Sequence, residues 1–289
     1  MPRDTSQLLQ GENDVLKLIV GRAPLPIVLE DLVRVAERHG STELLGSILL
    51  MDRDGVHLRH GAAPSLPTAY CQAIDGLVIG PNVGSCGTAA YHRKPVVVSD
   101  ISSDPLWTDF RDLAAQHGLR ACWSSPILSP SKAVLGTFAL YYRQPGSPTS
   151  EDEAMIDTLM RTAALAIEHH NALNETSESE ERYRSAARCA PIGLFVTDAS
   201  GAFSYVNPRF VELSGYEYEK TFDLWLEAAT GDPRLGQEWR QMLESRSEYS
   251  REVALSERGD RETSLRVAPL RSGAGAHLGF VGTLEGAHL

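Results

Sequence analysis

Four cysteines and nine histidines are the residues of this sequence best suited to bind a metal or to act as nucleophiles. The cysteines are Cys71, Cys86, Cys122 and Cys189. They lie far apart, and no C-x-x-C pair or Cys/His cluster occurs at metal-ligand spacing. His57 and His60 fall on a predicted strand, where a separation of three residues puts side chains on opposite faces. The sequence therefore predicts free thiols and no metal site.

Cys86 lies in a glycine-rich stretch, GPNVGSCGTAA at residues 80–90. Glycines let a backbone turn tightly and approach other groups, and the helix that they open directs unpaired N–H groups outward, where an anion can bind. The stretch lacks the Walker spacing with its lysine and the dinucleotide-binding glycine pattern. A tight connection is therefore the expected role of these glycines.

Bulk properties restrict the class of protein. A chain of 289 residues predicts two domains. A net charge of -11 argues against nucleic acid as a partner, because binding a phosphate backbone needs clustered Lys and Arg. No stretch reaches the roughly 18 consecutive apolar residues of a membrane helix, and residues 1–10 lack the apolar run of a signal peptide. We expect a cytoplasmic protein without a membrane partner.

The first part of the chain shows the pattern of an antiparallel sheet with helices. Apolar residues recur at near-helical spacing over 26–39, and Gly40 can end that helix. Strands are predicted at 44–51 and 56–60, joined by the turn Asp52-Arg53-Asp54-Gly55. Further strands are predicted at 96–98, 119–128 and 134–142. This arrangement indicates an α+β fold.

A long helix is predicted from residue 150, where Ser150 and Glu153 have the spacing of a capping box. Its apolar stripe consists of Ile156, Leu159, Met160, Ala163 and Ile167, and the sequence becomes polar and acidic from residue 171. We expect a partly exposed helix that joins two domains. Its stripe can pack within one subunit or against a second copy, and the pattern alone leaves both possibilities open.

The last third of the chain predicts a second small α+β unit. Strands at 192–198 and 202–206 flank the turn Asp198-Ala199-Ser200-Gly201. Helices are predicted at 207–215 and 233–244, and strands at 252–255, 262–270 and 278–284. The fold class is therefore α+β with two domains, each a central antiparallel sheet flanked by helices.

Several motifs of the first domain occur in the order typical of the GAF family. They are residues 80–90, PVVVSDI at 95–101, DPLW at 104–107, GLRACWSSPI at 118–127 and LGTFA at 135–139. On these motifs the first domain resembles a GAF domain. The resemblance implies a small molecule held between the sheet and the helices on one face. The candidate ligand-binding residues are Cys86, Thr88, Trp107, Phe110, His117 and Trp123.

The GAF ligand stays unnamed. A GAF-fold reductase of free methionine sulfoxide uses a cysteine in a context like that of Cys86, but its further cysteine before the fourth strand has no counterpart at residues 106–109. Residues 104–117 contain no cysteine for a bilin, and the cyclic-nucleotide signature N-K-x-x-x-F-x-x-x-D-E does not occur. We therefore expect no catalytic residues, and reduction of methionine sulfoxide through Cys86 is kept as the enzymatic alternative.

The last domain resembles a PAS domain. The resemblance rests on YR at 183–184, APIGL at 190–194, VTD at 196–198, YVNP at 205–208, LSGY at 213–216 and GFVGTLE at 279–285. No cysteine for a flavin adduct lies in 207–216, and no histidine for haem lies in 216–231. The cofactor of this domain is therefore unknown.

Together these patterns predict an N-terminal extension at 1–23, a GAF-like domain with the connecting helix at 24–174, and a PAS-like domain at 175–289. The resemblances imply a sensory protein that binds a small molecule and is not an enzyme. No output-domain motif follows residue 285, so we expect signalling through a homodimer or through a separate kinase or cyclic-dinucleotide protein. A purely structural dimerisation scaffold is the other alternative.

Overall fold

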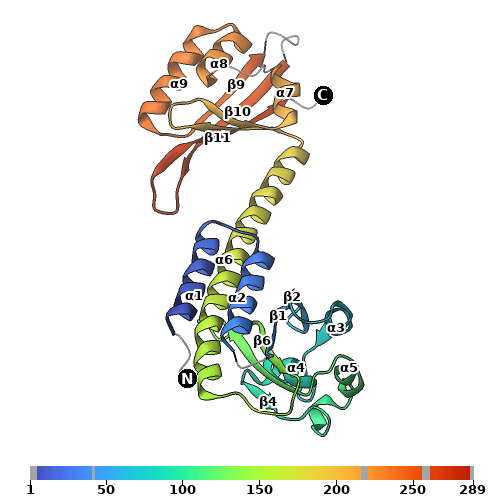
Figure 1. Cartoon of the computed structure of the whole chain (residues 1–289). Helices are drawn as coiled ribbons and strands as arrows, with labels where there is room; N and C mark the ends of the chain where they lie inside the picture. Colours follow the sequence, from blue (N-terminus) through green and yellow to red (C-terminus); the bar gives the residue numbers. More distant parts are fainter. Residues whose placement is uncertain (1–4, 41–42, 216–220, 256–260, 287–289) are drawn as a thin grey trace. The chain divides into compact units, whose positions relative to one another are not determined.

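The computed structural model describes residues 5–40, 43–215, 221–255 and 261–286. The chain divides into two compact units, Met1–Glu175 and Thr176–Leu289, which are described separately. Each unit contains one antiparallel sheet with helices against it (Figure 1). The predicted α+β class with two domains is therefore confirmed.

The sheet of the first unit has six strands in the order β3-β2-β1-β6-β5-β4, and all neighbouring strands are antiparallel. The strands are β1 (Leu45–Met51), β2 (His57–Ala62), β3 (Leu77–Val78), β4 (Val96–Val98), β5 (Ala121–Leu128) and β6 (Val134–Tyr142). The predicted hairpin of β1 and β2 is confirmed. Its turn is closed by Asp54, which accepts hydrogen bonds from the backbone N–H groups of Val56 and His57, while Gly55 adopts a φ of +69°.

Helices cover both faces of this sheet (Figure 1). One layer consists of α1 (Thr5–Val20), α2 (Leu25–His39) and the first half of α6 (Ser150–Cys189). The other layer consists of α3 (Thr68–Ile74), α4 (Gly84–His92), the 3-10 turn η1 (Pro105–Trp107) and α5 (Arg111–Gln116). Because the central strands are buried on both faces, β5 is apolar or small almost throughout rather than alternating with charged residues.

The long helix α6 is confirmed, and it runs without a break from the first unit into the second. Its predicted cap is wrong by one residue: Thr149 and Asp152 form the reciprocal hydrogen bonds, with Asp152 N–H donating to Thr149 Oγ1 at 3.2 Å. Its apolar stripe lies within the core of the first unit, where Ile156, Leu159 and Ile167 are all buried. This packing within one subunit accounts for the stripe.

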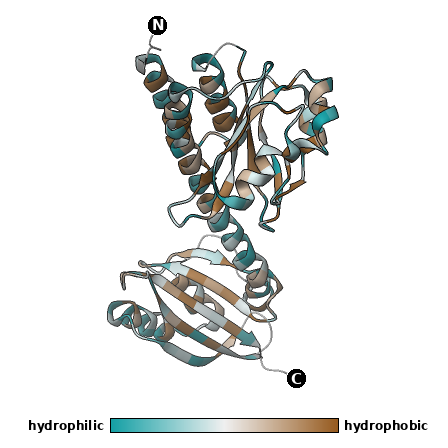
Figure 2. Cartoon of the chain, turned by 90° about the horizontal axis from the view of Figure 1, so that it is seen from below, coloured by the Kyte–Doolittle hydropathy of each residue, from teal (hydrophilic) through white to brown (hydrophobic). Residues whose placement is uncertain are grey.

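The second unit has a five-stranded sheet in the order β8-β7-β11-β10-β9. Its elements are β7 (Gly193–Asp198), β8 (Phe203–Val206), α7 (Pro208–Ser214), α8 (Phe222–Thr230), α9 (Pro233–Ser245), β9 (Tyr249–Leu255), β10 (Arg261–Arg271) and β11 (His277–Gly286). Hydrophilic and hydrophobic residues alternate along its strands, because one face lies against the helices (Figure 2). Aromatic rings fill the core between sheet and helices, including Phe195, Phe222, Trp239 and Phe280.

Within the second unit, the side chain of Asn207 joins the end of α6 to β7 and α7. Its carbonyl oxygen accepts hydrogen bonds from the backbone N–H groups of Leu194 and Phe210, and its amide donates to the carbonyl oxygens of Ala187 and Ile192. The side chain is completely buried, so each of these polar groups depends on its partner. One residue of the predicted PAS-like motif thus caps α7 and fixes the chain that enters β7.

Candidate functional site

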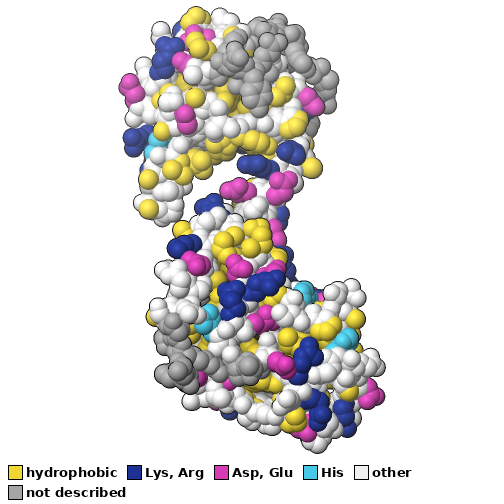
Figure 3. All heavy atoms as spheres, viewed as in Figure 1, with side chains coloured by type: hydrophobic (Ala, Val, Ile, Leu, Met, Phe, Trp, Pro, Cys, Tyr) yellow, Lys and Arg dark blue, Asp and Glu magenta, His cyan; other side chains and the backbone are white. Residues whose placement is uncertain are grey.

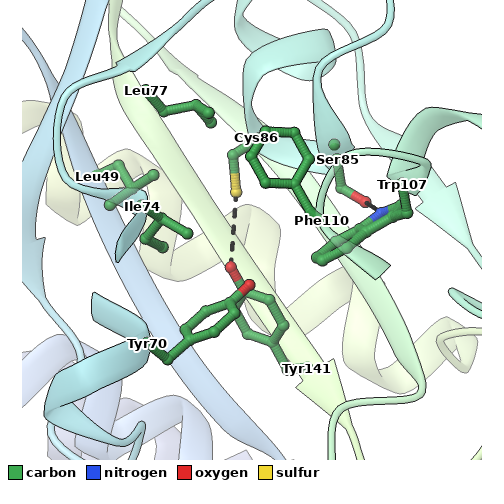
Figure 4. Close-up of a pocket in the computed structure, with 10 residues that line it drawn as sticks. Leu49, Tyr70, Ile74, Leu77, Ser85, Cys86, Trp107, Phe110 and Tyr141 are labelled. Atoms are coloured by element: carbon green, nitrogen blue, oxygen red, sulfur yellow. Dashed lines mark hydrogen bonds between the residues drawn. The ribbon is translucent and has the colours of Figure 1, made fainter. Parts of the chain in front are cut away.

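A small cavity lies between the sheet of the first unit and the layer of α3, α4 and α5 (Figure 4). Its volume is about 20 Å³. The ten lining residues come from strands, helices and connections: Leu49, Tyr70, Ile74, Leu77, Gly84, Ser85, Cys86, Trp107, Phe110 and Tyr141. All ten lie in the described part of the chain, and none of them is Asp, Glu, Lys, Arg or His. The cavity is therefore suited to an uncharged, mainly apolar molecule.

The glycine-rich stretch forms the roof of the cavity. Gly84 begins α4 with a φ of +53°, which a residue with a side chain rarely adopts. The helix that follows carries only small side chains on its buried face, so it lies close to β5 and β6. Thr88 closes the connection before α4, because its hydroxyl accepts a 3.0 Å hydrogen bond from the backbone N–H of Val83. The predicted tight connection matches this geometry.

Ser85 connects three parts of the site. Its hydroxyl accepts a 3.1 Å hydrogen bond from the indole N–H of Trp107 and donates to the carbonyl oxygen of Cys122 at 3.4 Å. Trp107 in turn packs edge-on against Phe110 and Tyr141. Since Ser85 and Trp107 are both buried, this hydroxyl fixes the orientation of the largest ring in the wall.

Cys86 is the thiol in the wall of the cavity. Its sulfur lies 3.9 Å from the phenol oxygen of Tyr141 (Figure 4). The neighbouring thiol of Cys122 and, after it, the hydroxyls of Ser124, Tyr141 and Thr137 lower the pKa of Cys86 to about 7, despite its burial. Burial and the thiol of Cys86 raise the pKa of Cys122 well above its ordinary value. Contacts with these neighbours thus favour the thiolate of Cys86, which is also the one of the two thiols that lines the cavity.

The structure brings together three of the six predicted site residues. Cys86, Trp107 and Phe110 line the cavity. Thr88 lies on α4 outside the lining, and its hydroxyl closes the connection before this helix. His117 lies behind the wall, with its ring edge-on to Tyr70 at a centroid distance of 5.7 Å.

Trp123 does not line the cavity, which corrects the prediction. It packs in the core under α2 and α6, on the opposite face of the sheet. Its neighbour Cys122 points to the cavity side, because successive residues of a strand point to opposite faces.

The predicted site omitted seven of the ten wall residues and one neighbour of the wall, and of the seven only Gly84 and Ser85 lie in a motif that the sequence marked. Tyr70 and Ile74 lie on α3, which no motif marked, and Leu49 and Leu77 resemble ordinary core residues in the sequence. Tyr141 had a usable signal, since the period of two along β6 puts it on the same face as Ala139. The neighbour is Cys122, which packing of α4 on β5 brings beside Cys86.

The described part of the chain contains no group of three or more His, Cys, Asp or Glu side chains that could hold a metal ion. None of its helices combines the length and the apolar character needed to cross a membrane. On the face in Figure 3, Lys and Arg are interspersed with Asp and Glu among the described residues rather than gathered in one basic surface.

Comparison with known proteins identifies both domains. A GAF domain model matches residues 23–168, and a PAS domain model matches residues 181–248. The chain is 35% identical over 223 residues to the methyl sulfide methyltransferase-associated sensor of Methanosarcina acetivorans, a match that covers 77% of this chain and 22% of that protein. It thus spans only about a fifth of that relative's length.

Solved structures of low sequence identity resemble part of the chain. A domain of a two-component sensor histidine kinase protein from Sinorhizobium meliloti is 21% identical, with a TM-score of 0.45, and covers 53% of this chain and 97% of its own. Free methionine-R-sulfoxide reductase from Neisseria meningitidis is 17% identical, with a TM-score of 0.45, and covers 57% and 89%. The family-model match over residues 23–168 shows that the chain belongs to the GAF domain family, and a PAS domain follows its GAF domain.

Proposed function

We propose that this chain is a sensory protein whose GAF domain binds a small, uncharged, mainly apolar molecule in the cavity under α4. The observation that carries the proposal is the lining, which contains two tyrosines, a tryptophan and a phenylalanine and no Asp, Glu, Lys, Arg or His side chain. Apolar pockets with a few fixed polar groups are typical of small-molecule sites. The sensory role agrees with the GAF and PAS domains and with the name of the Methanosarcina relative.

The size of the cavity makes binding a conformational event. A volume of about 20 Å³ holds about one water molecule. A larger ligand must therefore displace part of the wall. The outer wall consists of short elements, with two residues in β3 and three in η1, whereas the inner wall is the six-stranded sheet. We expect the segment from η1 to α5, which carries Trp107 and Phe110, to move when a ligand enters.

Strand β6 offers a route for the signal. Tyr141 lines the cavity on one face of β6, and its neighbour Leu140 packs on the other face in the core that includes α6. A ligand that binds one packing arrangement of this core more tightly than another shifts the relative populations of the two arrangements. We propose that α6 passes this shift to the PAS domain and then to a second copy of the chain or to a separate kinase or cyclic-dinucleotide protein.

Two neighbouring residues of β3 give a matched pair for testing the cavity. Leu77 lines the cavity, whereas Val78 points away and is 48% exposed. Leu77→Phe fills the cavity, and Val78→Phe adds the same group to the surface. Wild type and both variants are melted with a library of small uncharged molecules, and a ligand at 100 times its Kd should stabilise wild type by about 2.7 kcal/mol.

We expect this stabilisation to persist in Val78→Phe and to be lost in Leu77→Phe. Equal stabilisation of the two variants would place the ligand elsewhere. If no compound stabilises the wild type, ligand binding fails and the scaffold role is favoured.

One observation favours a second candidate function, thiol-dependent reduction of free methionine sulfoxide. Cys122 lies beside Cys86, so a second thiol is available to it. However, the lining offers no Lys, Arg or His for the carboxylate of that substrate and no Asp or Glu for its ammonium, and burying unpaired charges is costly. The apolar ligand is therefore preferred. Turnover of methionine sulfoxide that disappears in Cys86→Ser would reverse this preference.

A further inference from the structure

The two thiols beside the cavity are joined by the packing of α4 on β5. The hydroxyl of Ser85 donates to the carbonyl oxygen of Cys122, which fixes the first turn of α4 over this point of the strand. Cys122 pairs with Tyr141 across β5 and β6, and both side chains lie on the cavity face. Cys86, next to Ser85, lies 3.9 Å from the hydroxyl of Tyr141. The thiols of Cys86 and Cys122 therefore meet in the same small space.

Buried hydroxyl groups surround Cys86. Those of Ser124 and Thr137 are inaccessible to solvent and make no hydrogen bond at normal distance, yet both lie close enough to favour a thiolate at Cys86. A buried hydroxyl without a hydrogen-bond partner destabilises the fold, unless it forms a hydrogen bond in another state of the protein. A charged sulfur is such a state, because it accepts hydrogen bonds more strongly than a neutral thiol.

We propose that Cys86 and Cys122 form a redox pair that hydrogen peroxide oxidises to a disulfide within the GAF domain, which gives this domain an oxidative input besides its ligand. Cys86 lines the cavity, and the cavity holds a molecule of the size of water. Hydrogen peroxide is uncharged and only slightly larger than water, so it meets both limits. Bulky disulfide oxidants do not fit this space.

The reaction takes two steps. The thiolate of Cys86 attacks one oxygen of hydrogen peroxide, the O–O bond breaks, and the hydroxide that leaves takes up a proton to become water. Cys86 is then a sulfenic acid. The sulfur of Cys122 attacks the sulfur of Cys86, the S–O bond breaks, and the leaving hydroxide becomes a second water with the proton of Cys122. The two thiols thus lose two electrons and two protons to one peroxide, which becomes two molecules of water.

Cys86 is the attacking residue because it lines the cavity that peroxide enters, whereas Cys122 does not, and the hydroxyls around Cys86 favour its thiolate. The other two cysteines lie in different surroundings. Cys71 is buried on α3, where burial raises its pKa, and Cys189 is exposed at the end of α6. These two residues serve as internal controls.

The test uses the full chain carrying Cys189→Ser, so that the exposed thiol does not react. The protein is treated with one equivalent of hydrogen peroxide and mapped by peptide mass spectrometry without reduction. We expect one cross-linked pair of peptides that contains Cys86 and Cys122, lighter by two hydrogen atoms than the separate peptides and released by dithiothreitol. The cross-link should be unchanged when Cys71→Ser is added.

Two further variants separate the roles of the thiols. In Cys122→Ser, a sulfenic acid should persist at Cys86 and react with dimedone. In Cys86→Ser, Cys122 should remain a free thiol. The proposal is overturned if Cys86 of the folded wild type stays reduced at peroxide levels that oxidise Cys189, or if Cys86 pairs with Cys71 instead. Peptide mapping of the peroxide-treated wild type by itself decides between these outcomes, so the result does not depend on the folding of any variant.

Discussion

Ser85→Ala removes one oxygen that serves two buried partners. The indole N–H of Trp107 loses its acceptor, and the carbonyl oxygen of Cys122 loses a side-chain donor. Trp107 is only 3% exposed, so water does not reach the indole without a rearrangement of the wall. A buried donor left without a partner costs about 1–3 kcal/mol, and we expect the GAF domain to lose that much of its free energy of unfolding.

Ser47→Ala is the matched control. Ser47 is as deeply buried as Ser85 and lies in β1 of the same sheet, but its hydroxyl has no hydrogen-bond partner. Removing a hydroxyl that makes no hydrogen bond is expected to be neutral or to stabilise by up to about 1 kcal/mol. The same change of atoms thus has opposite expected effects at the two positions.

The assay is urea unfolding of the full chain, followed by tryptophan fluorescence and fitted with one transition for each domain. Trp107 and Trp123 report on the first unit, whereas Trp225 and Trp239 report on the second. Ser85→Ala should lower only the transition of the first unit. If Ser85→Ala and Ser47→Ala differ by less than about 0.5 kcal/mol, which is the usual scatter of neutral substitutions, the hydrogen bond to Trp107 does not hold the wall.

Two further predictions concern parts outside the cavity. Backbone N–H groups and His57 hold the pKa of Asp54 at about 2, below its ordinary value. The stability that this carboxylate contributes is therefore present above pH about 4 and is lost as the pH falls toward about 2. Asp54→Asn should flatten this part of a plot of melting temperature against pH. Asn207→Ala should lower the transition of the second unit by at least about 2 kcal/mol, because buried groups such as Phe210 N–H and the Ala187 carbonyl lose their partner; a loss confined to the first unit would contradict this.

Local patterns predicted most features whose physical cause is local. The Asp-Gly step at 54–55 predicted the hairpin of β1 and β2, since few other pairs allow the turn. The spacing of Ile156, Leu159 and Ile167 predicted the buried face of α6. The cap of that helix was misplaced by one residue, because Thr149 and Ser150 are both able to cap and only the hydrogen bonds distinguish them.

The wall of the cavity was only partly predictable. Cys86, Trp107 and Phe110 lie in motifs, whereas Tyr70 lies on α3, a short helix without a distinctive sequence. A strand of an antiparallel sheet usually reveals its buried face by alternation. In β5 this signal is absent, since helices cover both faces, so nothing in the sequence showed that Trp123 points away from the cavity.

The sequence by itself thus determined the two α+β domains, the helix that joins them and the tight turn before α4. Only the tertiary structure decided that Cys122 lies beside Cys86 and that the cavity has no acidic or basic side chain and is hardly larger than a water molecule. The physical reason is that turns, caps and periodic stripes depend on neighbours in the chain, whereas the contact between α4 and β5 depends on which faces of two distant elements are small enough to meet.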